Sequence, residues 1–139
     1  MASILVFEDD EMFRSFLIEA LSNAGHEVRG AADGEKGLRM FQAQPSDLVL
    51  TDIIMPGKEG IATVRELRKA NPTLGIIAMS GGVAKNSPLY LELAHGLGTD
   101  RTLQKPFRLE VLLKTVAEIL ALDATLRSRA GKKQLDQGN

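Results

Sequence analysis

Short apolar runs alternate along the chain with longer stretches of helical periodicity. Charged or turn residues bound each run, as is typical of buried strands. Five such runs predict strands, over residues 3–9, 26–31, 48–51, 75–80 and 101–104. Between and after them, apolar residues recur three or four positions apart, and these patterns predict five helices that begin near Asp10, Asp33, Ile61, Pro88 and Leu109. The first of these patterns consists of Met12, Phe13, Phe16, Leu17, Ala20 and Leu21.

This alternation predicts an α/β fold in which helices cover both faces of a parallel sheet. Right-handed crossovers leave few topologies open to such a chain. Ligands in sheets of this kind bind beyond the carboxyl ends of the strands, where the strand order reverses. The candidate functional residues are therefore those that follow directly on the predicted strands.

Composition and charge narrow the class of protein. The chain has 139 residues, of which 44% are hydrophobic and 25% charged, which suits one globular domain. Its net charge of −1 argues against direct nucleic-acid binding, and the lack of cysteine excludes disulfides and thiol catalysis. No apolar run is long enough for a leader or a membrane span. We expect a cytoplasmic protein with a folded domain over residues 1–122 and a polar helix extension or disordered tail over residues 123–139.

Charged and hydroxyl side chains gather where the predicted strands end: Glu8, Asp9, Asp52, Ser80 and Lys105. Three carboxylates at one edge would repel one another, so a hard divalent cation such as Mg²⁺ is the natural counter-charge. The lysine and the hydroxyl add a positive charge and a hydrogen-bond donor that suit a phosphoryl group. Asp52 would then be a carboxylate nucleophile that becomes an aspartyl phosphate.

Four segments, ILVFEDD, LVLTDIIMPG, IIAMSG and LQKPF, resemble in this order the motifs of response regulator receiver domains of two-component signalling. The resemblance covers roughly residues 3–122 and suggests a single-domain receiver of the chemotaxis-regulator type. It implies a flavodoxin-like, doubly wound sheet of five parallel strands in the order 2-1-3-4-5, with five helices. It also implies a phosphoprotein of a signalling relay that catalyses only its own phosphorylation and dephosphorylation.

The resemblance assigns the metal ligands. It implies that Asp9 binds Mg²⁺ directly, that Glu8 supports the ion through water, and that Asp52 and the backbone carbonyl of Ile54 complete the protein ligands. Mn²⁺ is expected to substitute for Mg²⁺.

The resemblance also assigns the groups that handle phosphate. Asp52 is expected to accept the phosphoryl group, Ser80 to hydrogen-bond one of its oxygens, and Lys105 to pair with another. A cis peptide bond between Lys105 and Pro106 is implied as well, and such bonds are largely confined to proline.

Two partners follow from the resemblance. One is a sensor histidine kinase or a histidine phosphotransfer protein that donates the phosphoryl group. The other is a downstream protein that recognises the face formed by the fourth helix, the fifth strand and the last helix. The polar tail is too short for a DNA-binding output domain, so we expect output through protein–protein contact, without direct nucleic-acid or membrane binding.

The sequence departs from the family pattern around its switch. Thr102 stands where the family usually has tyrosine or phenylalanine, and its β-branched side chain has less reach and a stiff rotamer. Gly81 replaces the usual alanine after Ser80, and Gly82 follows it. We therefore expect signalling to use ordering of an extended loop after Ser80 instead of an aromatic switch.

Three other functions fit parts of the pattern. A hydrolase of the haloacid-dehalogenase type needs a second acid two residues after its nucleophile. Ile54 occupies that place, which argues strongly against this class of enzyme. A flavin carrier would want a phosphate-binding loop after the first strand, where this chain is acidic. A receiver-like interaction module that no longer uses phosphorylation remains open because of Thr102, although the intact acids, Ser80 and Lys105 argue against it.

Overall fold

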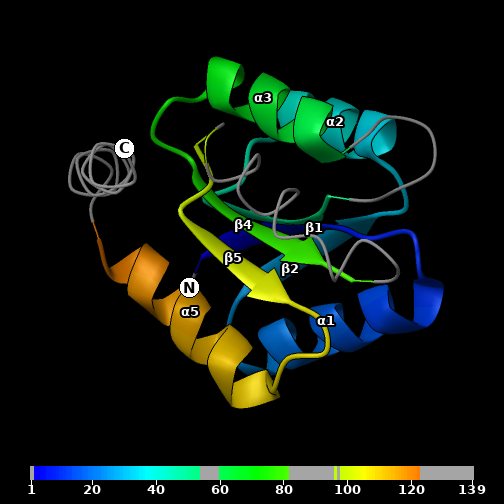
Figure 1. Cartoon of the computed structure of the whole chain (residues 1–139), viewed down its shortest axis with the longest axis vertical. Coiled ribbons are helices and arrows are strands. Elements are labelled where there is room, and N and C mark those ends of the chain that lie inside the picture. The colour runs from blue at the N-terminus through cyan, green and yellow to red at the C-terminus, as the bar shows by residue number, and fades with distance from the viewer. Residues whose placement is uncertain (1, 54–59, 82–95, 97, 123–139) are drawn as a thin grey trace.

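The computed structural model describes residues 2–53, 60–81, 96 and 98–122. Gly82, Ile54, most of the segment predicted to form the fourth helix, and the polar tail from residue 123 lie outside these ranges. Figure 1 shows the described elements as one sheet with helices above and below it.

Five parallel strands form the sheet, in the order β2-β1-β3-β4-β5. Their bounds are β1 Ser3–Phe7, β2 Glu27–Ala31, β3 Leu48–Asp52, β4 Gly75–Ser80 and β5 Arg101–Gln104. The predicted fold class and strand order are therefore confirmed. The order reverses between β1 and β3, because β2 lies outside β1 and the later strands lie on the other side.

Four helices are described, and each begins within a residue of its predicted start: α1 Glu11–Asn23, α2 Gly34–Ala43, α3 Gly60–Ala70 and α5 Leu109–Ala121. The helix predicted to begin near Pro88 lies outside the described residues. Among the helices that the structure describes, none is long and apolar enough to cross a membrane.

Side-chain caps explain where the first two helices begin. The carboxylate of Asp10 accepts the backbone N–H groups of Met12 at 3.0 Å and Phe13 at 3.2 Å, and Asp33 accepts that of Lys36 at 2.7 Å. Gly25, with φ of +100°, follows α1 in a left-handed conformation that glycine adopts without strain. The chain can therefore turn there and enter β2.

The core has two layers, one on each face of the sheet, because successive side chains of a strand point to opposite faces. On one face, Leu17 and Leu21 of α1 and Leu112 and Val116 of α5 pack on strand residues such as Ile4. The opposite face carries α2 and α3, through buried residues that include Phe41, Val64 and Leu67. Figure 1 shows α1 and α5 below the sheet and α2 and α3 above it.

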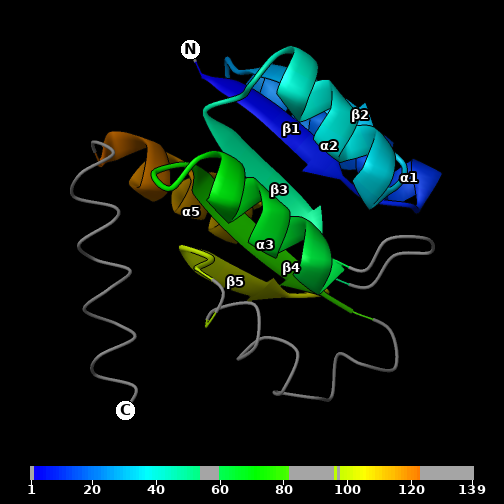
Figure 2. The same cartoon turned by 90° about the horizontal axis from the view of Figure 1, so that it is seen from above.

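All five strands run in the same direction, so their carboxyl ends lie along one edge (Figure 2). The last residues of β3 and β4, Asp52 and Ser80, are buried at this edge. Glu8 follows β1 and Lys105 follows β5 directly. The topology thus brings together residues that are far apart in the sequence.

Candidate functional site

Three carboxylates meet at the carboxyl edge of the sheet. One oxygen each of Glu8, Asp9 and Asp52 lie within 4.8 Å of one another. Glu8 is 1% exposed and Asp52 5% exposed, whereas Asp9 is open to solvent. A cluster of oxygen donors with one open side suits a hard divalent cation that keeps part of its water shell, as Mg²⁺ does.

Glu8 is held from several directions. Its backbone N–H donates to the carbonyl of Ala31 at 3.0 Å, and its own carbonyl accepts the guanidinium of Arg14 at 2.8 Å. The backbone N–H of Asp10 donates to Glu8 Oε2 at 3.1 Å. The start of α1 and the end of β2 therefore keep this buried carboxylate at the edge.

Lys105 bridges two of the acids. Its backbone N–H donates to the carbonyl of Ser80 at 2.7 Å, which ties the end of β5 to that of β4. Its ammonium donates to Asp52 Oδ2 at 2.7 Å and also to Glu8 Oε1. The peptide bond between Lys105 and Pro106 is cis. One lysine thus contacts carboxylates from two strands.

Burial and hydrogen bonds shift the pKa values of Glu8 and Lys105 in this cluster. Burial raises the pKa of Glu8 from 4.5 to about 7, against the hydrogen bonds from Lys105 and Asp10, and the charge of Asp52 adds to the rise. Burial acts to lower the pKa of Lys105, but its hydrogen bonds to Asp52 and Glu8 outweigh this and leave that pKa above 10.5. The lysine stays charged, and its one positive charge contacts two carboxylates, those of Glu8 and Asp52.

Ser80 contributes a buried hydroxyl. The residue is fully buried, and its Oγ has no hydrogen-bond partner among the residues that the structure describes. It follows Met79, which pairs with Asp52 across β3 and β4. A buried polar atom without a partner costs free energy, so an oxygen-rich ligand at this edge would relieve that cost.

One phenylalanine lies next to the lysine and belongs to a cluster of three aromatic rings. The Lys105 ammonium lies 4.6 Å from the centroid of the Phe13 ring. That ring makes an edge contact with Phe107 at 5.8 Å and stacks on Phe16 at 6.1 Å, both between centroids. Sequence reasoning treated Phe13 only as part of the helical periodicity. Phe13 belongs both to the apolar face of α1 and to the site, and no sequence signal separates packing from contact with the lysine.

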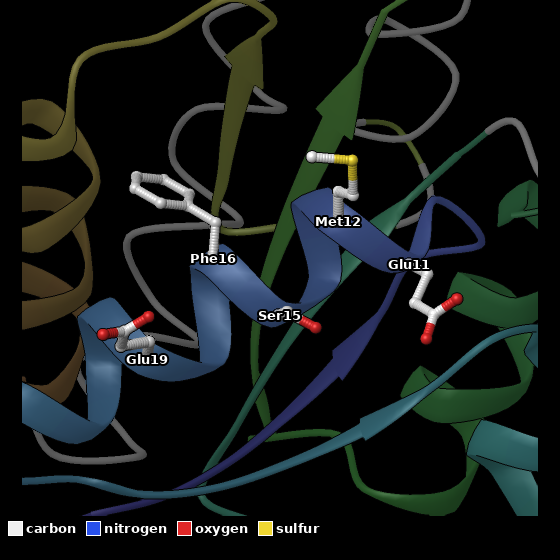
Figure 3. Close-up of a pocket in the computed structure, with 5 residues that line it drawn as sticks. All are labelled: Glu11, Met12, Ser15, Phe16 and Glu19. Atoms are coloured by element: carbon white, nitrogen blue, oxygen red, sulfur yellow. The ribbon is translucent and has the colours of Figure 1, made fainter.

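The outer face of α1 carries apolar side chains beside the site. Met12 is 85% exposed and Phe16 46% exposed, although the periodicity placed both with the buried Leu17. Figure 3 shows Met12 and Phe16 on the same side of the helix, where with Ser15 and two glutamates they line a shallow pocket. The apolar stripe of α1 is therefore wider than the part that the sheet covers.

The predicted switch residues are only partly described. Thr102 lies within β5, half-buried, and pairs with Ala78 of β4. Gly81 follows β4 and is also half-buried. Gly82 and the carbonyl of Ile54 lie outside the described residues, so the structure does not place them relative to the acids.

Comparison with known proteins supplies the family. Residues 4–117 match the model of the response regulator receiver domain. The response regulator receiver protein CpdR of Brucella abortus is 34% identical over 121 residues, which cover 86% of this chain and 98% of that protein. The chemotaxis protein CheY4 of Vibrio cholerae has a similar structure, with a TM-score of 0.78, 30% identity, and coverage of 86% of this chain and 98% of that one.

Other relatives are longer. The DNA-binding transcriptional regulator NtrC of Azospirillum brasilense is 35% identical over 119 residues, which cover 86% of this chain but 24% of that protein. The chain spans about a quarter to a half of the length of several curated relatives that it matches. The chain belongs to the response regulator receiver domain family of two-component signalling.

Proposed function

We propose that Asp52 accepts a phosphoryl group from a phosphohistidine on a sensor kinase or a histidine phosphotransfer protein. A carboxylate oxygen of Asp52 attacks phosphorus, the bond between phosphorus and the histidine nitrogen breaks, and the nitrogen leaves with the bonding electrons. The observation that carries this proposal is the 2.7 Å contact between Lys105 and Asp52 Oδ2 inside a buried acidic cluster. The lysine places a positive charge beside the carboxylate that would act as the nucleophile.

The acidic cluster also supports a role for Mg²⁺. Receiver domains normally bind Mg²⁺ at an acidic pocket, and Glu8, Asp9 and Asp52 present an oxygen donor each within 4.8 Å. Asp9, which is exposed, would be the main side-chain ligand, with Glu8 acting through water and Ile54 giving its carbonyl. The ion would neutralise charge on the carboxylates and on the phosphoryl oxygens.

Two residues would hold the phosphoryl group once it is on Asp52. The ammonium of Lys105 is within reach of one oxygen because it already contacts the carboxylate. The Ser80 hydroxyl, which has no partner among the described residues, would donate to another. Both groups act in a partly water-excluded site, where charge-assisted hydrogen bonds are strong.

We further propose a cytoplasmic protein whose output is a change of surface at β5, α5 and the segment after Ser80. Phosphorylation adds about 1.5 to 2 negative charges. We expect the backbone of Ser80 to move so that its hydroxyl reaches the phosphoryl oxygens. Hydrogen exchange with and without beryllofluoride, a phosphoryl mimic, tests this. Altered exchange in peptides that contain Gly81 and Thr102 is expected. Changes limited to Glu8, Asp9 and Asp52 would show a phosphate relay without conformational output.

The test of the phosphoacceptor is Asp52→Asn. The purified protein is incubated with Mg²⁺ and acetyl phosphate, and the intact mass is measured. Wild type should gain one phosphoryl group and Asp52→Asn none, because an amide oxygen cannot replace the attacking carboxylate. Asp47→Asn is the control, since Asp47 is an exposed aspartate before β3. Equal gain in wild type and Asp52→Asn would disprove the assignment, and no gain in wild type would favour an interaction module that does not use phosphorylation.

A further inference from the structure

The ring of Phe13 lies next to the lysine of the site. The Lys105 ammonium is 4.6 Å from the ring centroid, within the range of about 6 Å over which a cation and an aromatic face attract each other. The same ammonium donates to Glu8 and Asp52. The lysine therefore has three neighbours that favour its charge, and Phe13 is the one that brings no negative charge to the cluster.

The backbone and its neighbours hold the ring in place. The backbone N–H of Phe13 donates to the carboxylate of Asp10, at 3.2 Å, in the cap of α1. The ring meets Phe107 edge-on, and Phe107 is two residues after Lys105. A ring fixed by both a helix cap and a second aromatic presents its face in a defined place.

A glycine next to Lys105 leaves room for the aliphatic part of the lysine side chain. A Cβ atom at Gly81 would lie 2.8 Å from Cδ and 3.2 Å from Cβ of Lys105. The stem thus passes directly over the Gly81 backbone, where even an alanine would force it to shift. Gly81, directly after β4, and Phe13, in the first turn of α1, both lie against this side chain and limit its path.

We propose that Phe13 is a positioning residue that keeps the Lys105 ammonium at Asp52. This inference rests on the proposed function, because it concerns the lysine that would receive the phosphoryl oxygens. Hydrogen bonds to Glu8 and Asp52 need a narrow geometry, whereas attraction to a ring face tolerates displacement. When a phosphoryl group extends the Asp52 side chain, the ammonium can follow the new oxygens and still lie over the ring. Phe13 thereby keeps the Lys105 ammonium near the phosphoryl oxygens and limits the other positions that this ammonium can take.

A matched set of variants separates this role from packing. Phe13→Leu keeps an apolar side chain without a ring, and Phe13→Tyr keeps the ring. Phe16→Leu is the control, because Phe16 stacks on Phe13 but is 46% exposed on the outer face of α1. Phe13→Met serves as a second ring-free variant should Phe13→Leu fail to fold.

The first readout does not depend on phosphorylation. A ring face shifts the NMR resonances of nearby protons upfield, so the ε-methylene protons of Lys105 should be shifted in wild type, Phe13→Tyr and Phe16→Leu. The shift should vanish in Phe13→Leu. An unchanged shift in Phe13→Leu would show that the ring is not at the lysine in solution and would overturn the inference.

The second readout is the rate of phosphorylation by acetyl phosphate at saturating Mg²⁺. Phe13→Leu should be about three- to tenfold slower at saturating phosphodonor, the factor that corresponds to a partly exposed cation–π contact. Phe13→Tyr should restore the rate, and Phe16→Leu should match wild type. Equal loss in Phe13→Leu and Phe13→Tyr would mean that only packing matters and would contradict the inference. If wild type itself takes up no phosphoryl group, the proposed function fails, and the proton shifts alone decide on the position of the ring.

Discussion

The two ends of the sheet each carry a buried ionic group, and the two are built in opposite ways. At the amino ends of β4 and β5, the guanidinium of Arg68 contacts Asp100 Oδ2 at 3.4 Å. At the carboxyl ends, Lys105 contacts Glu8 and Asp52. Among the described residues, the first group pairs Arg68 with Asp100, while in the second Lys105 contacts two carboxylates and a third, that of Asp9, lies within 4.8 Å of both.

Arg68 sits in a network of mostly neutral acceptors. Its guanidinium donates to the backbone carbonyls of Pro72 at 2.8 Å and Leu74 at 2.7 Å, and also to that of Gly98. Asp100 in turn accepts the backbone N–H of Ile76 at 2.8 Å. These bonds join the end of α3, the loop after it and the strand β4. The one visible defect nearby is the buried Thr99 hydroxyl, which has no partner among the described residues.

Among the described residues of the carboxyl edge, acidic side chains outnumber the one lysine, and this arrangement does not maximise the stability of the fold. Glu8 has a raised pKa because it is buried, and the Ser80 hydroxyl is left without a described partner. Shifted pKa values and buried polar atoms without partners concentrate at functional sites, where a ligand supplies the missing charge or acceptor. The contacts of the amino edge thus account for stability of the fold, whereas the carboxyl edge has the charge imbalance that the proposed metal ion and phosphoryl group would offset.

The largest expected effect is at the amino edge. Arg68→Ala should lower the free energy of unfolding by about 3 kcal/mol, because it removes several charge-assisted hydrogen bonds and leaves Asp100 buried without its cation. Urea denaturation measures this. Arg65→Ala on the exposed face of the same helix should change stability by less than about 0.5 kcal/mol. If Arg68→Ala behaved like Arg65→Ala, the amino edge would not be the stabilising one.

The next effect is a pH dependence at the carboxyl edge. The pKa of Glu8 is about 7 in the folded protein against 4.5 ordinarily, so the folded state binds more protons between these values. The free energy of unfolding should therefore fall as pH rises from 4.5 to 7, by about 2 kcal/mol, when divalent cations are absent. Glu8→Gln cannot titrate there, so the difference between its stability and that of wild type should grow with pH. A difference that stays constant over this range would refute a raised pKa.

The smallest expected effect is a change in the free energy of unfolding when an aspartate is replaced by asparagine, and its sign should differ between the two ends of the sheet. Without divalent cations at pH 7, Asp52→Asn should stabilise the fold by about 1 kcal/mol, because it relieves repulsion among the acids and still offers Lys105 an acceptor. Asp100→Asn should destabilise the fold, because it weakens the pair with Arg68. Thermal melts of the two variants check this. Destabilisation of the same size in both would remove the distinction between the edges.

Much of the fold follows from residue patterns because those patterns are physical constraints. The apolar runs predicted all five strands to within a few residues, and Asp10 and Asp33 marked two helix starts that their caps explain. The parallel order then implied that Glu8, Asp52 and Ser80 would meet at one edge. That convergence needs only the direction of the strands.

Contacts made by side chains across that edge were harder to predict. Arg68 was missed because three of its partners are backbone carbonyls in loops, which leave no pattern in the sequence. Lys105 was expected to pair with a phosphoryl oxygen, and its bond to Glu8 was not foreseen. Met12 and Phe16 were grouped with buried residues because periodicity gives the apolar face of a helix but not the width that neighbours cover.

The most direct test locates the phosphoryl group chemically. The wild-type protein is phosphorylated with acetyl phosphate and Mg²⁺, reduced with borohydride and digested, and its peptides are mapped by mass spectrometry. Borohydride converts an aspartyl phosphate to homoserine, so homoserine at position 52 is the expected result. Homoserine in place of another aspartate, such as Asp9 or Asp100, would contradict the claim that Asp52 accepts the phosphoryl group. A phosphorylated protein that yields no homoserine would contradict it as well.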